Sequence, residues 1–497
     1  MLYQALKRLS KHSLVYAIGP AVHKVAGFLL IPLVTGYVGG TENYGVLGMA
    51  NVIIVIASQA LGVNLLSGMQ RFYTRYETPE ERATLITTTM TLLACTTGVA
   101  LLLGTLLATP LSRLIFDSSA DAPVLRLSLA ILFFQLNGQV GMRYLQLREM
   151  SGTYVAVQVG KLFLEIALKV VFMVALSLEH IGALYSVLIG EMLVSLGLTG
   201  VIFSKLRYGF RWDMAKRLIR YSYPLVISGL CMFVLHQADR FLILKMIGKS
   251  ETGLYNLAYQ FGAMVNALLL QSFGLIWFPY IFSIHEESKI CHLCRKIFTY
   301  FVLLASASSF VCALFAREMI FVMADPEFRS AWTTVPVVLF GYVFWAMYQL
   351  FQTAFFVRER TVWITVLTAM AAMVNVGLNL LFIPRFGYIG AAWATLIAFM
   401  LLAAAAGWLA ERMLPVRYEG GRILAPVILG VGLYGVSQIL PFETVLVTVL
   451  AKMGLVVLFP VLLVAGGYLT DKEKSKLRAL TRMMRSMIRR KMRKLSS

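Results

Sequence analysis

Stretches of about twenty predominantly apolar residues recur along this chain from Leu14 to Tyr468, with most charged residues between them. An α-helix of that length crosses the ~30 Å hydrocarbon core of a bilayer. Charged residues make up 14% of the chain, whereas soluble domains carry about 25%. The sequence therefore predicts an all-α membrane protein. Its fourteen expected spans are 14–38, 45–66, 85–107, 127–145, 154–177, 182–203, 222–244, 254–276, 297–316, 335–356, 362–383, 389–410, 423–440 and 445–468.

The distribution of Lys and Arg tests this count, because these residues are retained on the cytoplasmic side of a membrane. With the N-terminus inside, the inner segments and their edges hold 33 of the 45 basic residues, and the outer loops hold six. An error of one helix would mix the two classes. The basic start, 1–11, leads into an apolar run too long for a signal-peptide core. We therefore expect a multi-pass protein of the inner (plasma) membrane with both termini cytoplasmic.

An internal repeat divides the spans into two sets. Segment 180–192 matches segment 388–400 at six of thirteen positions, at an offset of 208. Three small residues share this offset, since Gly40, Gly45 and Ala50 recur as Gly248, Gly253 and Ala258. Spans one to six are thus repeated as spans seven to twelve in the same orientation. Transporters built from parallel repeats enclose a central site at the repeat interface.

The repeat gives the expected organisation. Residues 1–209 form an N-lobe of six helices, 210–415 a C-lobe of six, and 416–470 two further helices. The tail, 471–497, holds eleven basic residues, and its apolar residues recur every three or four positions. This pattern favours a basic amphipathic helix on anionic membrane lipids over a solvated tail. The chain as a whole has a net charge of +21, and the largest concentration of basic residues is in this tail. Because membrane lipids account for that concentration, we expect no nucleic-acid partner.

Charged residues inside the spans are candidate functional groups, because each costs roughly 2.5–3.5 kcal/mol on insertion scales. Lys161, Glu165 and Lys169 follow one another at four-residue spacing and share one helix face. Glu191 on the next span lies at nearly the depth of Lys169, which predicts an ion pair between those two residues. The alternative role for Glu165 or Glu191 is exchange of a proton or sodium ion.

Lys24 stands near the middle of the first span with no acidic residue one turn away. Such a cation requires an anionic partner, which is either a ligand or a carboxylate on a neighbouring helix such as Asp239. On the seventh span, Arg240 shares a face with His236, and Asp239 lies on the adjacent row. Arg240 can bind phosphate oxygens through two parallel hydrogen bonds, or it can be neutralised by Asp239. The sequence is compatible with both alternatives.

The five cysteines predict neither a disulfide framework nor a metal site. Cys291 and Cys294, with His285 and His292 nearby, have a spacing that zinc ligands use. A reduced amphipathic helix on the cytoplasmic side explains the same pattern. We therefore expect no metal and no cofactor.

Several motifs, together with their order along the chain, resemble those of the polysaccharide transport family, whose superfamily also holds multidrug exporters and lipid II flippases. The most similar stretch is ADRFLILKMIG from Ala238 to Gly248, followed by ETGLYNLA from Glu251 to Ala258. The other motifs are Ile31-Pro32, TENYG at 41–45, Arg148-Glu149, Pro224 and NLLFIPRFGYIGA at 379–391.

The resemblance implies two six-helix lobes around a cavity lined by the first, second, seventh and eighth spans. Similar proteins flip undecaprenyl-diphosphate-linked oligosaccharides, the repeat units of O-antigen, capsule or exopolysaccharide, outward across the membrane, often driven by H⁺, Na⁺ or membrane potential. It further implies partners in polysaccharide polymerisation and export. On this basis the expected diphosphate contacts are Lys24, Arg71 and Arg240, and the expected sugar contacts are Gln237, Gln260 and Asn266.

Other functions make different demands on the sequence. An exporter of organic cations requires a cavity rich in carboxylates, whereas the spans hold three acids against eight Lys, Arg or His residues. A lipid II flippase is expected to have a more crowded basic cavity. A membrane polymerase or ligase is expected to have long outer loops, and the longest here, 108–126 and 317–334, are short. A non-catalytic transporter is therefore the expected class.

Overall fold

The computed structural model describes residues 22–284, 286–439, 445–470 and 473. Within these ranges every regular element is a helix. The helix through 22–29 precedes the first labelled element. The N-terminal elements are α2 (Ile31–Tyr37), α3 (Gly40–Leu61), α4 (Val63–Tyr73), α5 (Pro79–Leu106), α6 (Ala108–Phe116), α7 (Ala122–Leu147), α8 (Ser151–Lys169), the π-helix η1 (Val170–Ala175) and α9 (Glu179–Lys205).

The second half of the chain repeats this sequence of long helices. Its elements are α10 (Trp212–Met246), α11 (Lys249–Val265), the π-helix η2 (Asn266–Gln271), α12 (Ser272–Phe282), α13 (Glu287–Leu314), α14 (Ala316–Met323), the 3₁₀-helix η3 (Pro326–Thr333), α15 (Val335–Val357), α16 (Val362–Met413), α17 (Gly420–Ile439) and α18 (Val445–Ala465).

The helices confirm a protein of about fourteen membrane spans. Eleven of the described helices are long and apolar enough to cross a bilayer. One of them, α16, folds back at Gly387, which has φ 64° and ψ −152°, so it supplies two spans. Helix α8 continues through η1 and forms another span, although it carries three charged residues. The last is the first predicted span, of which residues 22–38 are described.

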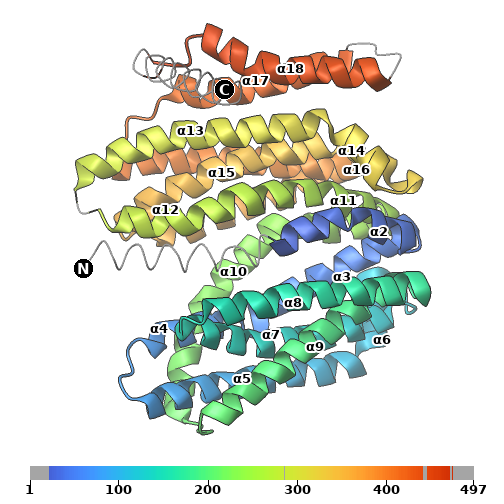
Figure 1. Ribbon diagram of the computed structural model, residues 1–497, viewed down its shortest axis with the longest axis vertical. Coiled ribbons are helices and arrows are strands. Elements are labelled where there is room, and N and C mark those ends of the chain that lie inside the picture. Colours follow the sequence, from blue (N-terminus) through green and yellow to red (C-terminus); the bar gives the residue numbers. More distant parts are fainter. Residues whose placement is uncertain (1–21, 285, 440–444, 471–472, 474–497) are drawn as a thin grey trace, which may run out of the picture.

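Figure 1 shows how these spans are arranged. Helices α3 to α9 form one group, α11 to α16 form a second, and α17 and α18 lie together outside the second group. Helix α10 crosses from the first group to the second. Its residues Met214 and Leu218 pack in a core cluster with Leu66 and Met69 of α4. The boundary predicted at residue 210 therefore lies beside a helix that contacts both groups, and the predicted lobe limits stay predictions.

We call the end of the bundle that carries loops 74–78, 206–211 and 358–361 and the non-helical residues 283, 284 and 286 the basic end. The two groups contact each other directly at the opposite end, where α3 crosses α11. Gly45 and Gly253, which the offset of 208 relates, meet at this crossing. A Cβ on Gly45 would lie 2.0 Å from the backbone oxygen of Lys249, and one on Gly253 would lie 2.1 Å from that of Thr41. Only glycine permits so close an approach at both positions.

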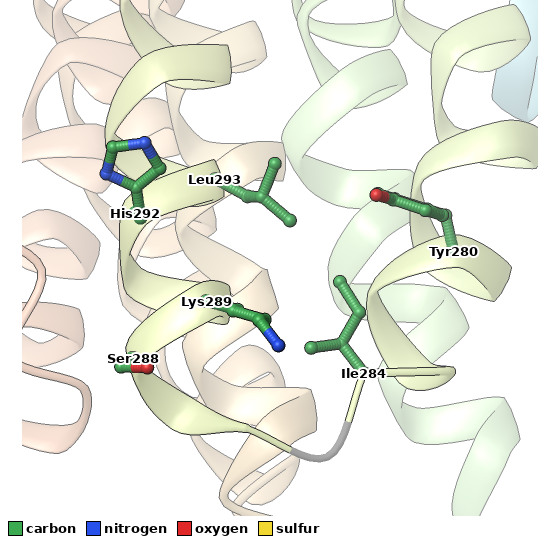
Figure 2. A pocket seen from close by; sticks show the side chains of 6 residues that line it. All are labelled: Tyr280, Ile284, Ser288, Lys289, His292 and Leu293. Atoms are coloured by element: carbon green, nitrogen blue, oxygen red, sulfur yellow. The ribbon is translucent and has the colours of Figure 1, made fainter.

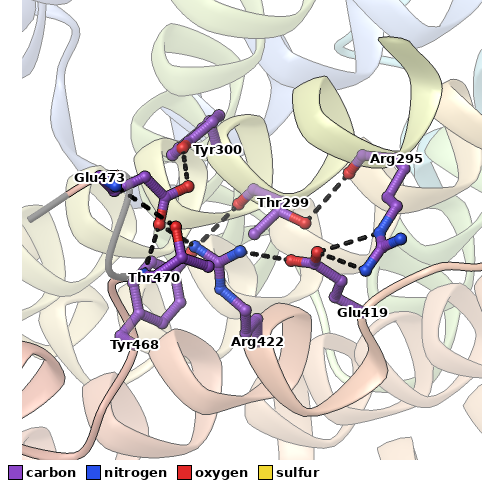
Figure 3. Close-up of polar contacts among 8 residues, drawn as sticks. All are labelled: Arg295, Thr299, Tyr300, Glu419, Arg422, Tyr468, Thr470 and Glu473. Carbon is purple, nitrogen blue, oxygen red and sulfur yellow. Dashed lines mark hydrogen bonds and ion pairs between the residues drawn. The ribbon is translucent and has the colours of Figure 1, made fainter. Parts of the chain in front are cut away.

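Polar contacts attach the last two helices to the C-terminal group (Figure 3). At the start of α17, Arg422 bridges Glu419 and Glu473, at 2.5 and 2.8 Å. Glu419 also binds Arg295 of α13 at 2.8 Å. Towards the other end, buried Lys452 of α18 binds Glu318 of α14 at 2.6 Å. The predicted amphipathic tail lies outside the described residues, apart from Glu473.

Candidate functional site

Lys24 lies on the helix that passes between the two groups of helices (Figure 1). Its side chain is exposed, and within the described residues it has no ion pair or hydrogen bond. The neighbouring His23 is within electrostatic range of Lys161 and Lys169 on α8. The first span therefore runs beside the charged face of α8, and Lys24 is a cation without a carboxylate partner among the residues that the structure describes.

The charged face of α8 pairs with α9, but not through the residue that the spacing predicts. Glu191 binds Lys161 at 2.5 Å rather than Lys169, and Lys161 also lies 3.5 Å from Glu165. The predicted pair of Glu191 with Lys169 was wrong, because the helices begin and end at other residues than the apolar runs indicate. Glu191 lies 12 residues after Glu179, where α9 begins, and Lys161 lies 14 residues before Ala175, where η1 ends. Within the described residues Lys169 has no ion-pair partner.

Arg240 is buried in a polar network on α10 and α11. Its Nη1 atom donates to the backbone oxygen of His236 at 2.8 Å and to Oδ1 of Asp239 at 3.1 Å. Its Nε atom donates to Oδ1 of Asn256 at 2.8 Å. The guanidinium lies over the ring of Tyr259, 4.3 Å from its centroid. The side chain is 9% exposed. Of the two alternatives for Arg240, neutralisation by Asp239 is the one seen in this state.

Asp239 and His236 are both engaged within the same region. The hydroxyl of Tyr255 donates to Oδ2 of Asp239, so this carboxylate has a partner on each side and does not pair with Lys24. The His236 ring packs edge-on against Trp345, with centroids 4.4 Å apart, and beside Phe399. The His236 ring is therefore held by aromatic packing, while its backbone oxygen accepts a hydrogen bond from Arg240.

The remaining predicted residues are distributed over α4, α10, α11 and η2. Arg71 is exposed in the last turn of α4 at the basic end, with its guanidinium 5.0 Å from the ring centroid of Tyr221. Gln260 donates to the hydroxyl of Tyr44 at 2.5 Å, across the contact between the two groups. The side-chain oxygens of Gln237 and Asn266 are buried without a hydrogen-bond partner within the described residues. The predicted set thus does not form one compact site in this state.

The structure also shows a buried polar cluster that the sequence analysis missed. Asn375 donates to Thr395 at 3.1 Å, and Asn379 donates to Oδ1 of Asn375 at 3.0 Å. All three are buried between the two halves of α16. Two amides four residues apart in an apolar span could have revealed this cluster, since both lie on one helix face.

A hollow of about 490 Å³ lies between α12 and α13 at the basic end. Figure 2 shows its lining: Tyr280, Ile284, Ser288, Lys289, His292 and Leu293. None of these is a predicted site residue, and Lys289 is engaged with Glu286 at 2.6 Å. His285 lies outside the described residues. The described part of the chain contains no group of three or more potential metal ligands, and the expectation of no metal stays a prediction.

Comparison with known proteins identifies the family. The model of the polysaccharide biosynthesis protein family matches residues 9–285, which is more than half of the chain. An uncharacterized membrane protein of Methanocaldococcus jannaschii, MJ1068, is 19% identical over 232 residues. That match covers 46% of this chain and 46% of the relative, so the chain spans about half the length of the curated protein that it matches.

Solved structures show the same fold. The lipid II flippase MurJ, in an inward closed conformation, has a TM-score of 0.71 at 13% identity and covers 91% of this chain and 97% of its own. An inward-facing multidrug resistance MATE family transporter of the MOP superfamily has a TM-score of 0.63 at 16% identity, covering 83% and 94%. The chain therefore belongs to the polysaccharide biosynthesis protein family, and its fold is that of these two solved structures.

Proposed function

We propose that this protein flips a lipid-linked, diphosphate-bearing oligosaccharide from the cytoplasmic to the outer face of the membrane by alternating access. The cytoplasmic face is the basic end, where the charge distribution predicts it. The membrane is the inner membrane, and both termini are cytoplasmic. A gradient of H⁺ or Na⁺ supplies the energy, and polymerase and export proteins use the product.

The observation that carries this proposal is the imbalance between paired acids and unpaired bases. The three acids inside the spans all have cationic partners, since Glu165 and Glu191 share Lys161 and Asp239 binds Arg240. Lys24 and Lys169 have none within the described residues. An unpaired ammonium inside a membrane protein is expensive unless a ligand or water neutralises it. This arrangement suits an anionic cargo.

The position of the free cations supports a path for a diphosphate. Arg71 is exposed at the basic end. Lys24 lies 13 residues before Tyr37, where α2 ends, which is about 20 Å along the helix axis. A diphosphate leaving water loses hydration, and fixed charges along its route replace that hydration. Arg71 would meet the headgroup at the entrance and Lys24 near the middle of the membrane.

An exporter of organic cations would need free carboxylates, and the acids of the described spans are engaged. The family match also favours polysaccharide synthesis over drug export. Lipid II carries the same diphosphate chemistry, so the cargo assay must include it.

The test is a flipping assay with purified protein in liposomes. Undecaprenyl-diphosphate-oligosaccharide, lipid II and an organic cation are supplied separately, and exposure of each at the far leaflet is measured. Lys24→Ala should lower the flipping rate by about tenfold or more, which corresponds to 1.4 kcal/mol or more. The matched control is Lys205→Ala, because Lys205 is exposed at the end of α9. Normal flipping by Lys24→Ala would contradict the proposed anion site.

A deletion strain separates transport from catalysis. Lipid-linked repeat units that accumulate on the cytoplasmic face support a flippase. Units that reach the outer face but stay unpolymerised would indicate a polymerase or ligase instead.

A further inference from the structure

One face of α10 is directed towards the N-terminal group of helices. Phe233, Gln237, Arg240 and Leu244 follow at spacings of four, three and four residues and therefore share this face. Phe233 and Leu244 pack in a core cluster with residues of α3, including Met49. Gln237 and Arg240 lie between these two apolar contacts. The polar middle of this face is thus enclosed where α10 meets α3.

Helix α11 completes the enclosure. The amide of Asn256, held by Arg240, lies against Gly48 of α3, where an added Cβ would come within 1.8 Å of Nδ2. Within the described residues neither Nδ2 of Asn256 nor Oε1 of Gln237 has a hydrogen-bond partner, although both atoms are buried. A buried unpaired polar atom costs about 1–3 kcal/mol. We call this enclosed contact of α10 and α11 with α3, around Arg240, the seam. It holds unpaired polar atoms to which a polar ligand could form hydrogen bonds.

The contacts that close this seam lie between it and the end opposite the basic loops. Thr41 and Ser250 share a hydrogen bond of 2.7 Å, and Lys249 binds Asp121 at 2.6 Å. Arg240 lies six residues before Met246, where α10 ends, and is thus about 9 Å from that end. Separation of α3 from α11 would open a short route from the far side to Arg240.

We propose that Arg240, Asn256 and Gln237 form a second anion station, closed in the present state and exposed only when α3 separates from α11. This inference rests on the proposed function, because it makes Arg240 the station that the diphosphate reaches after Lys24. The Nη2 atom of Arg240 makes no hydrogen bond within the described residues, so it remains free to donate to a phosphate oxygen. Asn256 Nδ2 supplies a further donor.

The two stations differ in charge. Lys24 has no counter-ion within the described residues, whereas the charge of Arg240 is balanced by Asp239 at 3.1 Å. A diphosphate would therefore be held at Lys24 by net charge and hydrogen bonds, and at Arg240 mainly by hydrogen bonds. Weaker binding at the second station favours release on the outer side.

The experiment measures access to the seam. Gln237→Cys is labelled with a membrane-impermeant thiol reagent in liposomes, and the modified peptide is quantified by mass spectrometry. Adding Gly45→Leu, whose Cβ would lie 2.0 Å from the backbone of α11, should hold the seam open and raise the labelling rate about tenfold. The matched control is Gly200→Leu, because Gly200 has no atom within 4 Å of an added Cβ. It should leave labelling unchanged.

Anion binding is then tested in the open variant. Inorganic diphosphate should slow labelling of Gln237→Cys in the Gly45→Leu background, and Arg240→Gln should remove that protection while Lys24→Ala preserves it. Unchanged labelling in Gly45→Leu, or faster labelling without protection by diphosphate, would overturn the second station. Neither result would affect the proposed function, which depends on whether Lys24→Ala blocks flipping.

Discussion

Two helical hairpins can be compared, one made by α8, η1 and α9 and the other formed within α16. Both have a close backbone contact at the tip, but the polar residues between their helices differ. A Cβ on Gly182 would lie 3.0 Å from the backbone of Phe172, and one on Gly390 would lie 2.5 Å from the backbone oxygen of Phe382. Gly182 and Gly390 differ by 208 positions, whereas Phe172 and Phe382 differ by 210. The π-helix η1 and the turn after it make the first hairpin two residues longer.

Because Phe172 and Phe382 make the same contact, residues at equal distances before them occupy corresponding positions in the two hairpins. Glu165 lies seven residues before Phe172, and Asn375 lies seven before Phe382; by the same count Lys169 corresponds to Asn379. The first hairpin thus carries charges where the second carries neutral amides. The repeat has retained the backbone contact and changed the polar chemistry. In the proposed transport cycle, the charged hairpin lies beside Lys24, and the neutral hairpin supports the lobe that contains Arg240.

The largest effect should come from breaking the charged hairpin. Lys161→Met leaves Glu165 and Glu191 buried without their shared cation, so we expect a loss of about 3–5 kcal/mol of stability. Thermal unfolding of the purified protein in detergent measures this loss. The triple variant Lys161→Ala, Glu165→Asn and Lys169→Asn copies the neutral hairpin.

That triple variant sharpens the comparison. In the triple variant Glu191 would be the one buried acid of the hairpin left without a cation, so Glu191→Gln is added. The resulting quadruple variant should recover most of the stability lost in Lys161→Met. It should still flip cargo more slowly than the unmodified protein, because Lys169 is absent. A variant that remains as unstable as Lys161→Met would show that the two hairpins are not interchangeable in packing.

A smaller effect is expected at the hairpin tips. Gly390→Ala should cost about 2–3 kcal/mol, because its Cβ would meet a backbone oxygen, which cannot rotate away. Gly182→Ala should cost less, since its closest contact is 3.0 Å rather than 2.5 Å. Gly200→Ala serves as the control without a neighbour. Unfolding temperatures in the order Gly200→Ala, Gly182→Ala, Gly390→Ala, from highest to lowest, are the expected result.

In the neutral hairpin, Asn375→Ala should cost about 1–2 kcal/mol, because it removes the donor to the hydroxyl of Thr395 and one of the two acceptors of the Asn379 amide. The cost is smaller than for Lys161→Met since no charge is left unpaired. The same thermal measurement tests this ranking. A larger loss for Asn375→Ala than for Lys161→Met would reverse our account of the two hairpins.

The smallest effect lies outside both hairpins, where Glu473 joins α17 to α13. Partial burial alone would raise the pKa of Glu473, but hydrogen bonds from Tyr300, Thr470 and Arg422 outweigh it and lower the pKa to about 2. The unfolded chain has a glutamate pKa of about 4.3. Because the folded pKa is the lower one, the stabilisation is present above about pH 4 and is lost as the pH falls towards 2.

Glu473→Gln should therefore lower stability at pH 7 by about 1 kcal/mol or less, because the group is close to the surface. The difference from the unmodified protein should shrink between pH 4 and pH 2. Unfolding temperatures of both proteins across that range test the sign. A difference that is constant with pH would show that the carboxylate charge does not contribute.

Some of the site could be predicted from the sequence and some could not. Lys24 was found because an unpaired charge in an apolar run is visible in a single segment. The partner of Glu191 was predicted wrongly because it depends on where two helices begin and end, which apolar runs define only within a few residues. The cluster of Asn375 and Thr395 was missed because the candidates inside the spans were chosen by charge, and neutral amides and hydroxyls carry none.

The sequence by itself determined the number of spans, the sorting of basic residues and the repeat, since each follows from hydropathy, charge and residue identity along one segment. Only the tertiary structure decided that Gly45 meets Gly253, that Asp239 neutralises Arg240, and that Lys24 has no acidic partner among the described residues. These facts depend on side chains from helices far apart in the chain. Their distances follow from how whole helices pack, which no local pattern specifies.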